Sequence, residues 1–256
     1  MRRILFIPDR YMDYRMWADI PDRLGGRAEV IHFAQHEQVP WAEADSGFLD
    51  AVRGLAGDGS LDIVVAAGQA ARFGFAVAEA GLARGLVLFY PSLDRVLDEV
   101  ISGMADVDPA DLLEPYLPIA GALHEEDASR RLDILVQAVR DTAGPDTEPA
   151  ELARAVEMIS DHAAEFFADL QATHTAGTAD RPQPEPPWLQ RPWIDHLATL
   201  TIPVTAVVAP PAAAIAEAIT SRARDTEIVL ASPRLTPIAA PSESAQALTQ
   251  MLDLLD

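Results

Sequence analysis

Residues 64–74 read VVAAGQAARFG, an apolar run that reaches Gly68 and continues through small residues. An apolar run without polar alternation is typical of a strand that is buried on both faces of a parallel sheet. Small residues directly after such a strand allow a tight turn into a helix that packs close to the sheet. We therefore expect a strand, a sharp turn and a helix, in this order.

Similar apolar runs recur along the chain and predict further strands, with helical patterns between them. The strand candidates are Ile4–Ile7, Glu29–Phe33, Asp62–Ala66, Leu86–Tyr90, Pro203–Val208 and Glu227–Ala231. Met16, Ile20 and Leu24 are spaced four apart, and residues 248–255 carry an apolar stripe. This alternation predicts an α/β fold with a mostly parallel, doubly wound sheet of about six strands.

Residues 97–200 break the pattern, because strand-like runs are missing from this stretch. Apolar stripes over 132–139 and 152–170 predict two helices, and Pro149 suits the first turn of the second one. Residues 181–192 contain five prolines, which predicts an extended return loop. We expect a helical cap at 97–200, inserted into a core domain formed by 1–96 and 201–256.

The composition excludes several kinds of chemistry. The chain has no cysteine and all 19 of its basic residues are arginine, so thiolate and lysine chemistry are absent. This bias is typical of a GC-rich genome, such as an actinobacterial one. A net charge of −21 disfavours nucleic acid and anionic lipid as partners. The first apolar run is too short for a signal peptide or a membrane span, so we expect a cytoplasmic protein.

The order of these segments resembles the α/β-hydrolase family over nearly the whole chain. The resemblance is carried by the run Ile4–Asp9 with Met16 and Trp17 after it, by the turn in 64–74, by the strand at 86–91 and by the return at 192–204. It implies the α/β-hydrolase fold with an inserted cap. It also implies an N-terminally shortened version, because the antiparallel strands that usually open the fold have no counterpart here.

The nucleophile elbow of this family reads G-x-S-x-G. In this chain Gly68 matches the first glycine, Ala70 stands at the serine position and Arg72 stands at the second glycine. A register shifted by one residue would put Gln69 at the serine position, and an amide is no better as a nucleophile. The resemblance therefore implies an elbow without a catalytic serine.

The other two triad positions differ as well. Arg234 is the best match for the histidine, and a guanidinium cannot act as a base at neutral pH. The usual acid position falls at 209–211, which contains no carboxylate, and Asp94 is the candidate replacement. We expect no ordinary esterase activity.

The resemblance also implies a pocket at the carboxyl ends of the strands, under the cap. Its oxyanion hole would use the amides of Ala71 and of Asp9 or Arg10. His162 lies beside an apolar stripe of the cap and could face the cavity. The candidate pocket residues are Asp9, Arg10, Tyr11, Gln69, Ala70, Ala71, Tyr90, Asp94, His162 and Arg234.

We expect neither a metal nor another cofactor. His32 and His36 are four residues apart, but the sequence offers no third ligand beside them. The glycine spacing does not match a phosphate-binding loop.

Three functional hypotheses follow. The first is a non-hydrolytic enzyme that binds a mainly hydrophobic small molecule under its cap. It would catalyse a cyclisation, isomerisation or elimination, for example in polyketide natural-product biosynthesis. The second is a non-catalytic ligand-binding or accessory protein. The third is a hydrolase with a relocated triad, in which Ser92 would be the nucleophile and His124 or His162 the base. The expected partner is the small molecule, with no nucleic acid and no membrane, and a homodimer is left open.

Overall fold

The computed structural model describes residues 1–9, 12–17, 19–33, 47–57, 59–91, 121–122, 124–143, 147–168, 171, 199–208, 226–230 and 241–256. Its centre is one sheet whose six strands are all parallel to their neighbours. The strands are β1 (Arg2–Ile7), β2 (Ala28–His32), β3 (Leu61–Ala67), β4 (Ala83–Phe89), β5 (Val204–Val208) and β6 (Thr226–Leu230). Each predicted apolar run overlaps one of these strands to within a few residues at its ends, which confirms the predicted α/β class and its doubly wound parallel sheet.

The strand order β2-β1-β3-β4-β5-β6 contains one reversal of direction. The chain passes from β1 outward to β2, returns to β3 on the other side of β1, and then continues outward to β6. The reversal therefore lies between β1 and β3. In open α/β sheets this topological switch point leaves a crevice at the carboxyl ends of the two strands, where ligands bind.

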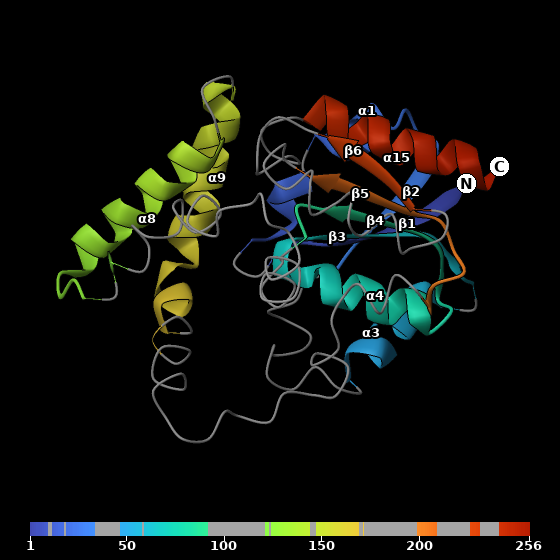
Figure 1. The fold of residues 1–256 in the computed structure, drawn as a ribbon, viewed down its shortest axis with the longest axis horizontal. Coiled ribbons are helices and arrows are strands. Elements are labelled where there is room, and N and C mark those ends of the chain that lie inside the picture. The colour runs from blue at the N-terminus through green and yellow to red at the C-terminus, as the bar shows by residue number, and fades with distance from the viewer. Residues whose placement is uncertain are drawn as a thin grey trace, which may run out of the picture.

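Helices cover both faces of the sheet (Figure 1). One face carries α3 (Gly47–Ala56) and α4 (Ala71–Glu79), and the other carries α1 (Ile20–Arg23) and α15 (Pro241–Leu255). Alternate residues of the strands belong to two separate apolar clusters, one on each face. The apolar strands are therefore buried on both faces, as their sequence predicts.

The spacing of Met16, Ile20 and Leu24 leads to two short helical segments, the 3-10 helix η1 (Tyr14–Trp17) and α1. Pro21 lies in the first turn of α1. A proline is tolerated there, but it cannot continue a helix from the preceding turn, since it lacks an N–H donor.

The described part of 97–200 contains helices and no strand. Its two longer helices, α8 (Ala128–Ala143) and α9 (Pro149–Asp161), pack against each other beyond the carboxyl ends of the strands (Figure 1). Pro149 begins α9, as predicted. The second stripe was expected to form one helix to residue 170, but α9 ends at Asp161 with His162 as its C-cap, and a new helical segment covers 163–168. The bounds of the cap, 97 and 200, stay a prediction.

Among the described residues, every helix is too short or too polar to cross a lipid bilayer.

Candidate functional site at the carboxyl ends of β1 and β3

The turn from β3 into α4 is built around Gly68. This residue is buried and has a φ of +52°, in the left-handed region that glycine adopts without steric cost. A short 3-10 helix, η3 (Gly68–Ala70), leads directly into α4. Ala70 has a φ of −71° and a ψ of −8°, which is ordinary right-handed helical backbone. The residue with the special conformation is therefore Gly68, two positions before Ala70.

The carboxylate of Asp9 lies directly against this turn. Asp9 follows β1, and its Oδ1 atom accepts a hydrogen bond of 2.9 Å from the backbone N–H of Gln69. A Cβ atom added to Gly68 would overlap with both carboxylate oxygens of Asp9. Asp9 thus occupies the space that a side chain at position 68 would need. Glycine is required at this position both for its φ and for this close approach.

The backbone on both sides holds this contact in place. The N–H of Met12 donates to the carbonyl oxygen of Asp9 at 3.0 Å, which fixes the chain after β1. The N–H of Ala71 donates to the carbonyl oxygen of Gly68, so this amide is used inside the 3-10 turn. The N-terminal end of η3 and α4 is the positive end of the helix dipole, which favours a carboxylate at this point.

Arg72 folds back along the same turn. Its Nε–H donates to the carbonyl oxygen of Gln69 at 3.1 Å, and its guanidinium lies 5.9 Å from the centre of the Phe73 ring. The chain therefore accommodates an arginine at the expected second glycine, because the side chain runs along the surface of the turn.

Ala70 and Ala71 contribute to core packing. Ala70 is fully buried and Ala71 nearly so. Both belong to the apolar cluster on the α3 and α4 face, together with Phe48 and Phe73. The buried residues of α8 and α9 belong to the cluster on the opposite face. The pocket predicted beside Ala70, at the carboxyl ends of the strands, stays a prediction.

Tyr90 directly follows β4, the strand beside β3. Its φ of +35° is unusual for a bulky residue, and the strain of such a conformation is often found at ligand sites. The Tyr90 backbone N–H donates to Val207 at 2.8 Å, and its hydroxyl group lies 3.9 Å from the sulfur of Met16. The fully buried Trp17 packs between two other aromatic rings. Its ring centre lies 4.9 Å from that of Phe6 and 5.7 Å from that of Phe89. Trp17 therefore braces the core.

A cluster of charges connects the cap helix α9 to the segment after β1. Arg15 pairs with Asp13 and with Asp161, at 2.7 Å in each case. His162 lies 4.0 Å from Asp13 and 3.8 Å from Glu165. Burial by itself raises the pKa of Asp13, but the hydrogen bonds from Arg15 outweigh burial and the pKa lies below its ordinary value. His162 is thus part of the contact between cap and core.

Of the predicted pocket residues, the structure brings Asp9 and Gln69 into contact and places Tyr90 directly after β4, the strand adjacent to β3. Arg10, Tyr11, Asp94 and Arg234 lie outside the described residues. Sequence reasoning did not identify Gly68 as the apex of the turn. The small residues Ala66 and Ala70, two positions before and after it, were an available sign. Within the described residues, no group of three or more acidic or histidine side chains is arranged to hold a metal.

Solved structures that are similar over the whole chain are enzymes of the α/β-hydrolase fold. A thermophilic esterase from Thermogutta terrifontis matches with a TM-score of 0.61 and 16% identity, over 100% of this chain and 90% of the other. MenH from S. aureus has a TM-score of 0.65 and 13% identity over 99% and 94%. The haloalkane dehalogenase DatA from Agrobacterium tumefaciens has a TM-score of 0.65 and 16% identity over 100% and 90%. No family model and no curated protein matches the chain. The chain has the α/β-hydrolase fold.

Proposed function

We propose that this protein is a non-hydrolytic enzyme of the α/β-hydrolase fold, which binds a small molecule at the carboxyl ends of β1 and β3. The observation that carries the proposal is the left-handed conformation of Gly68. In this fold the nucleophile stands on the strained turn between strand and helix. We assign that position to Gly68, with Ala66 and Ala70 in place of the two flanking glycines. An elbow with glycine at its apex has no nucleophile.

The oxyanion position supports the same proposal. In the family, the amide after the nucleophile is one donor of the oxyanion hole. With Gly68 at the apex, that donor is the N–H of Gln69, which is hydrogen-bonded to Asp9. A tetrahedral anion from ester hydrolysis would have to compete with this carboxylate. The site therefore lacks both the nucleophile and an open oxyanion donor for acyl transfer.

We infer that the ligand is a mainly hydrophobic molecule without negative charge. Buried apolar side chains lie near this end of the sheet. Met12 donates its N–H to the carbonyl oxygen of Asp9, Phe89 pairs with Ala67 at the end of β3, and Met16 lies beside the hydroxyl group of Tyr90. Asp9 adds a carboxylate, and the chain as a whole carries a net charge of −21. Both would repel an anionic ligand. Cyclisation, isomerisation or elimination of such a molecule, as in natural-product tailoring, fits a confined apolar site.

Two measurements test this proposal together. The first is hydrolysis of p-nitrophenyl acetate and butyrate, with labelling by a fluorophosphonate. We expect turnover at the level of buffer and no labelled serine, and a labelled serine would favour the relocated triad with Ser92. The second is binding of a panel of neutral hydrophobic metabolites, followed by NMR of the methyl groups of Met12 and Met16. If no compound shifts either methyl resonance, the proposal is wrong.

The contact between Asp9 and Gln69 also supports a second candidate, a non-catalytic ligand-binding protein. An amide that is already satisfied inside the protein is what an inactive elbow would contain. The two candidates differ in turnover: a binding protein would release every bound compound unchanged, which mass spectrometry after long incubation would detect.

A further inference from the structure

We propose that Asp9 is the general base of this site, a carboxylate brought to the elbow from β1 in place of a side chain on the elbow itself. This inference rests on the proposed function, because it assigns the reacting group of the same crevice. It specifies the substrate class as a neutral compound with an acidic C–H bond beside a carbonyl group.

The position of Asp9 is the first argument. The topological switch point places the carboxyl ends of β1 and β3 side by side, and Asp9 reaches across to the apex of the neighbouring turn. A Cβ atom at position 68 would overlap with the carboxylate of Asp9, so this carboxylate lies where an elbow side chain would begin. The reactive group of the fold and the carboxylate of this chain therefore occupy nearly the same place.

The second argument is the way in which the carboxylate is held. The N–H of Gln69 fixes Oδ1, and the N–H of Met12 fixes the backbone of Asp9. Gly68 and Gln69 are then positioning residues. A general base needs this kind of fixed placement, because proton transfer requires the base within hydrogen-bond distance of the proton that it removes.

The reaction is balanced without another reactant. The C–H bond of the substrate breaks, its proton forms an O–H bond on Asp9, and the electron pair moves to the carbonyl oxygen as an enolate. Where a C=C bond stands β,γ to the carbonyl group, the electron pair is shared over a dienolate, and return of the proton from Asp9 to the γ-carbon gives the α,β-unsaturated isomer and restores the carboxylate. The chemistry needs only the chain's own residues and a neutral substrate.

The test uses 5-nitrobenzisoxazole, a neutral aromatic probe for carboxylate bases. Removal of its ring C–H proton by the base breaks the N–O bond and releases a coloured cyanonitrophenolate. We expect the protein to accelerate this reaction by about 10²-fold over acetate at equal carboxylate concentration. Asp9→Asn should reduce the rate to that of the solution reaction.

Matched variants separate the role of Asp9 from folding. Gly68→Ala should lower the rate at least about 10-fold, because its methyl group displaces the carboxylate. Gly81→Ala is the control, since Gly81 also has a positive φ of +67° but has open space around its Cβ position. It should keep the full rate. The double variant Asp9→Gly with Gly68→Asp returns a carboxylate to the elbow and should regain part of the activity.

Three outcomes decide the question. Loss of turnover in Asp9→Asn and in Gly68→Ala, with Gly81→Ala unchanged, supports the inference. If the probe shifts the methyl resonance of Met12 or Met16 but is not turned over, or if Asp9→Asn is as active as the parent, Asp9 is not the base and the proposed function still stands. If neither this probe nor the metabolite panel shifts these resonances, the proposed function is wrong as well.

Discussion

The carboxylate of Asp9 fills the space in which a side chain on Gly68 would lie, although the two residues follow different strands, β1 and β3. The contact couples the choice of residue at the two positions. A side chain at position 68 requires that Asp9 move, and Asp9 in its present place requires glycine at position 68. The coupling is a property of the fold, because β1 and β3 are neighbouring strands and the chain reverses its direction across the sheet between them.

We predict that Gly68→Ala destabilises the protein more than Gly81→Ala does. At both positions alanine must adopt a left-handed backbone, which costs about 1 to 2 kcal/mol. At position 68 the methyl group also overlaps with Asp9, and such overpacking adds about 1 to 3 kcal/mol. The measurement is urea unfolding of the two variants. In the background of Asp9→Gly the difference between them should become small, and a difference that persists there would show that the carboxylate is not its cause.

A second prediction concerns Ala70→Ser, the change that would restore the expected elbow serine. Ala70 is fully buried in the apolar cluster on the α3 and α4 face. A hydroxyl group there loses its hydration, so we expect a loss of about 1 to 3 kcal/mol in unfolding free energy. We also expect no fluorophosphonate labelling. Ala80→Ser, at the exposed end of α4, should change stability by less than about 0.5 kcal/mol. Labelling of the serine introduced at position 70 would contradict the proposed placement of Gly68.

The sheet could be predicted from the sequence because burial on both faces leaves a local record, an unbroken apolar run, in each strand. The left-handed turn at Gly68 could not. The sequence match to the family motif uses Gly68 as the first glycine and Ala70 as the serine position, whereas our proposal moves the nucleophile position to Gly68. What distinguishes Gly68 is its φ and its contact with Asp9, and the latter joins two segments that are far apart in the chain. The end of α9 before His162 could not be predicted either, because the apolar stripe of the sequence continues through this position.

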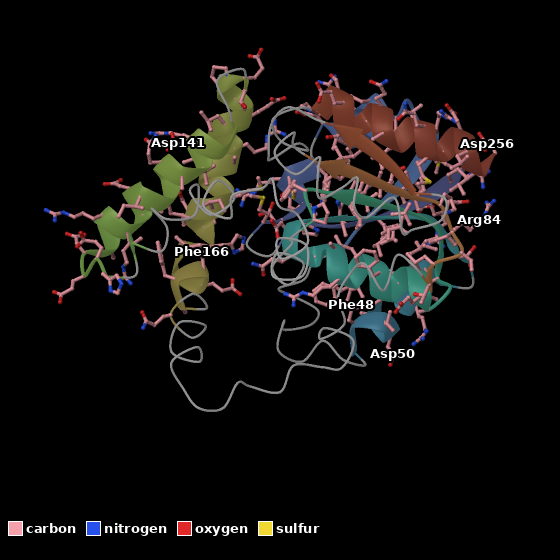
Figure 2. All side chains as sticks on the ribbon, viewed as in Figure 1. Phe48, Asp50, Arg84, Asp141, Phe166 and Asp256 are labelled. Atoms are coloured by element: carbon pink, nitrogen blue, oxygen red, sulfur yellow. The ribbon has the colours of Figure 1, made fainter. Side chains whose placement is uncertain are left out.

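The third prediction is a pH dependence at the amino edge of the sheet, where Figure 2 shows Arg84 and Asp256 on the side away from α8 and α9. Asp62 accepts hydrogen bonds from the backbone N–H of Arg3 at 2.8 Å, from Arg2 at 2.7 Å and from Arg84 at 3.1 Å. Burial alone raises the pKa of this carboxyl group. The hydrogen bonds outweigh burial, and the pKa lies below its ordinary value of 3.8.

A carboxyl group with a lowered pKa in the folded state stabilises the protein above its unfolded-state pKa, and this contribution is lost as the pH falls through the folded-state pKa. We therefore expect Asp62→Asn to lower the unfolding free energy by about 1 to 2 kcal/mol at neutral pH. The difference from the parent protein should shrink as the pH falls below the ordinary value of 3.8 and through the lower folded-state pKa. Asp50→Asn, which removes an exposed pair with Arg53, should cost less than about 0.5 kcal/mol. A loss for Asp62→Asn that is equal at both pH values would contradict the electrostatic explanation.

The last prediction concerns the docking of the cap on the core. Asp161 is the final residue of α9 and pairs with Arg15 at 2.7 Å. A negative charge at this end of a helix is unfavourable by itself, because it faces the negative end of the helix dipole. Asp161 therefore has opposite effects on its own helix and on the contact with the core. Asp141 lies near the C-terminal end of α8 (Figure 2), so its charge also faces the negative end of a helix dipole. Its carboxylate accepts a hydrogen bond from Gln137 of the same helix.

Neutralising Asp141 should therefore stabilise α8, whereas neutralising Asp161 should destabilise the docking of α9. Asp141→Asn should slow amide hydrogen exchange in α8 slightly, because removal of the charge favours the helix by about 0.3 to 1 kcal/mol at low salt. Asp161→Asn should instead speed exchange in α9, since loss of the pair with Arg15 loosens the docking. A double-mutant cycle with Arg15→Gln should give a coupling of about 0.5 to 1 kcal/mol that declines with added salt, because Asp161 is 54% exposed and the pair is screened. If exchange in α9 slows in Asp161→Asn as it does in α8 of Asp141→Asn, the ion pair does not hold the cap, and the apolar residues of α9 must account for its position.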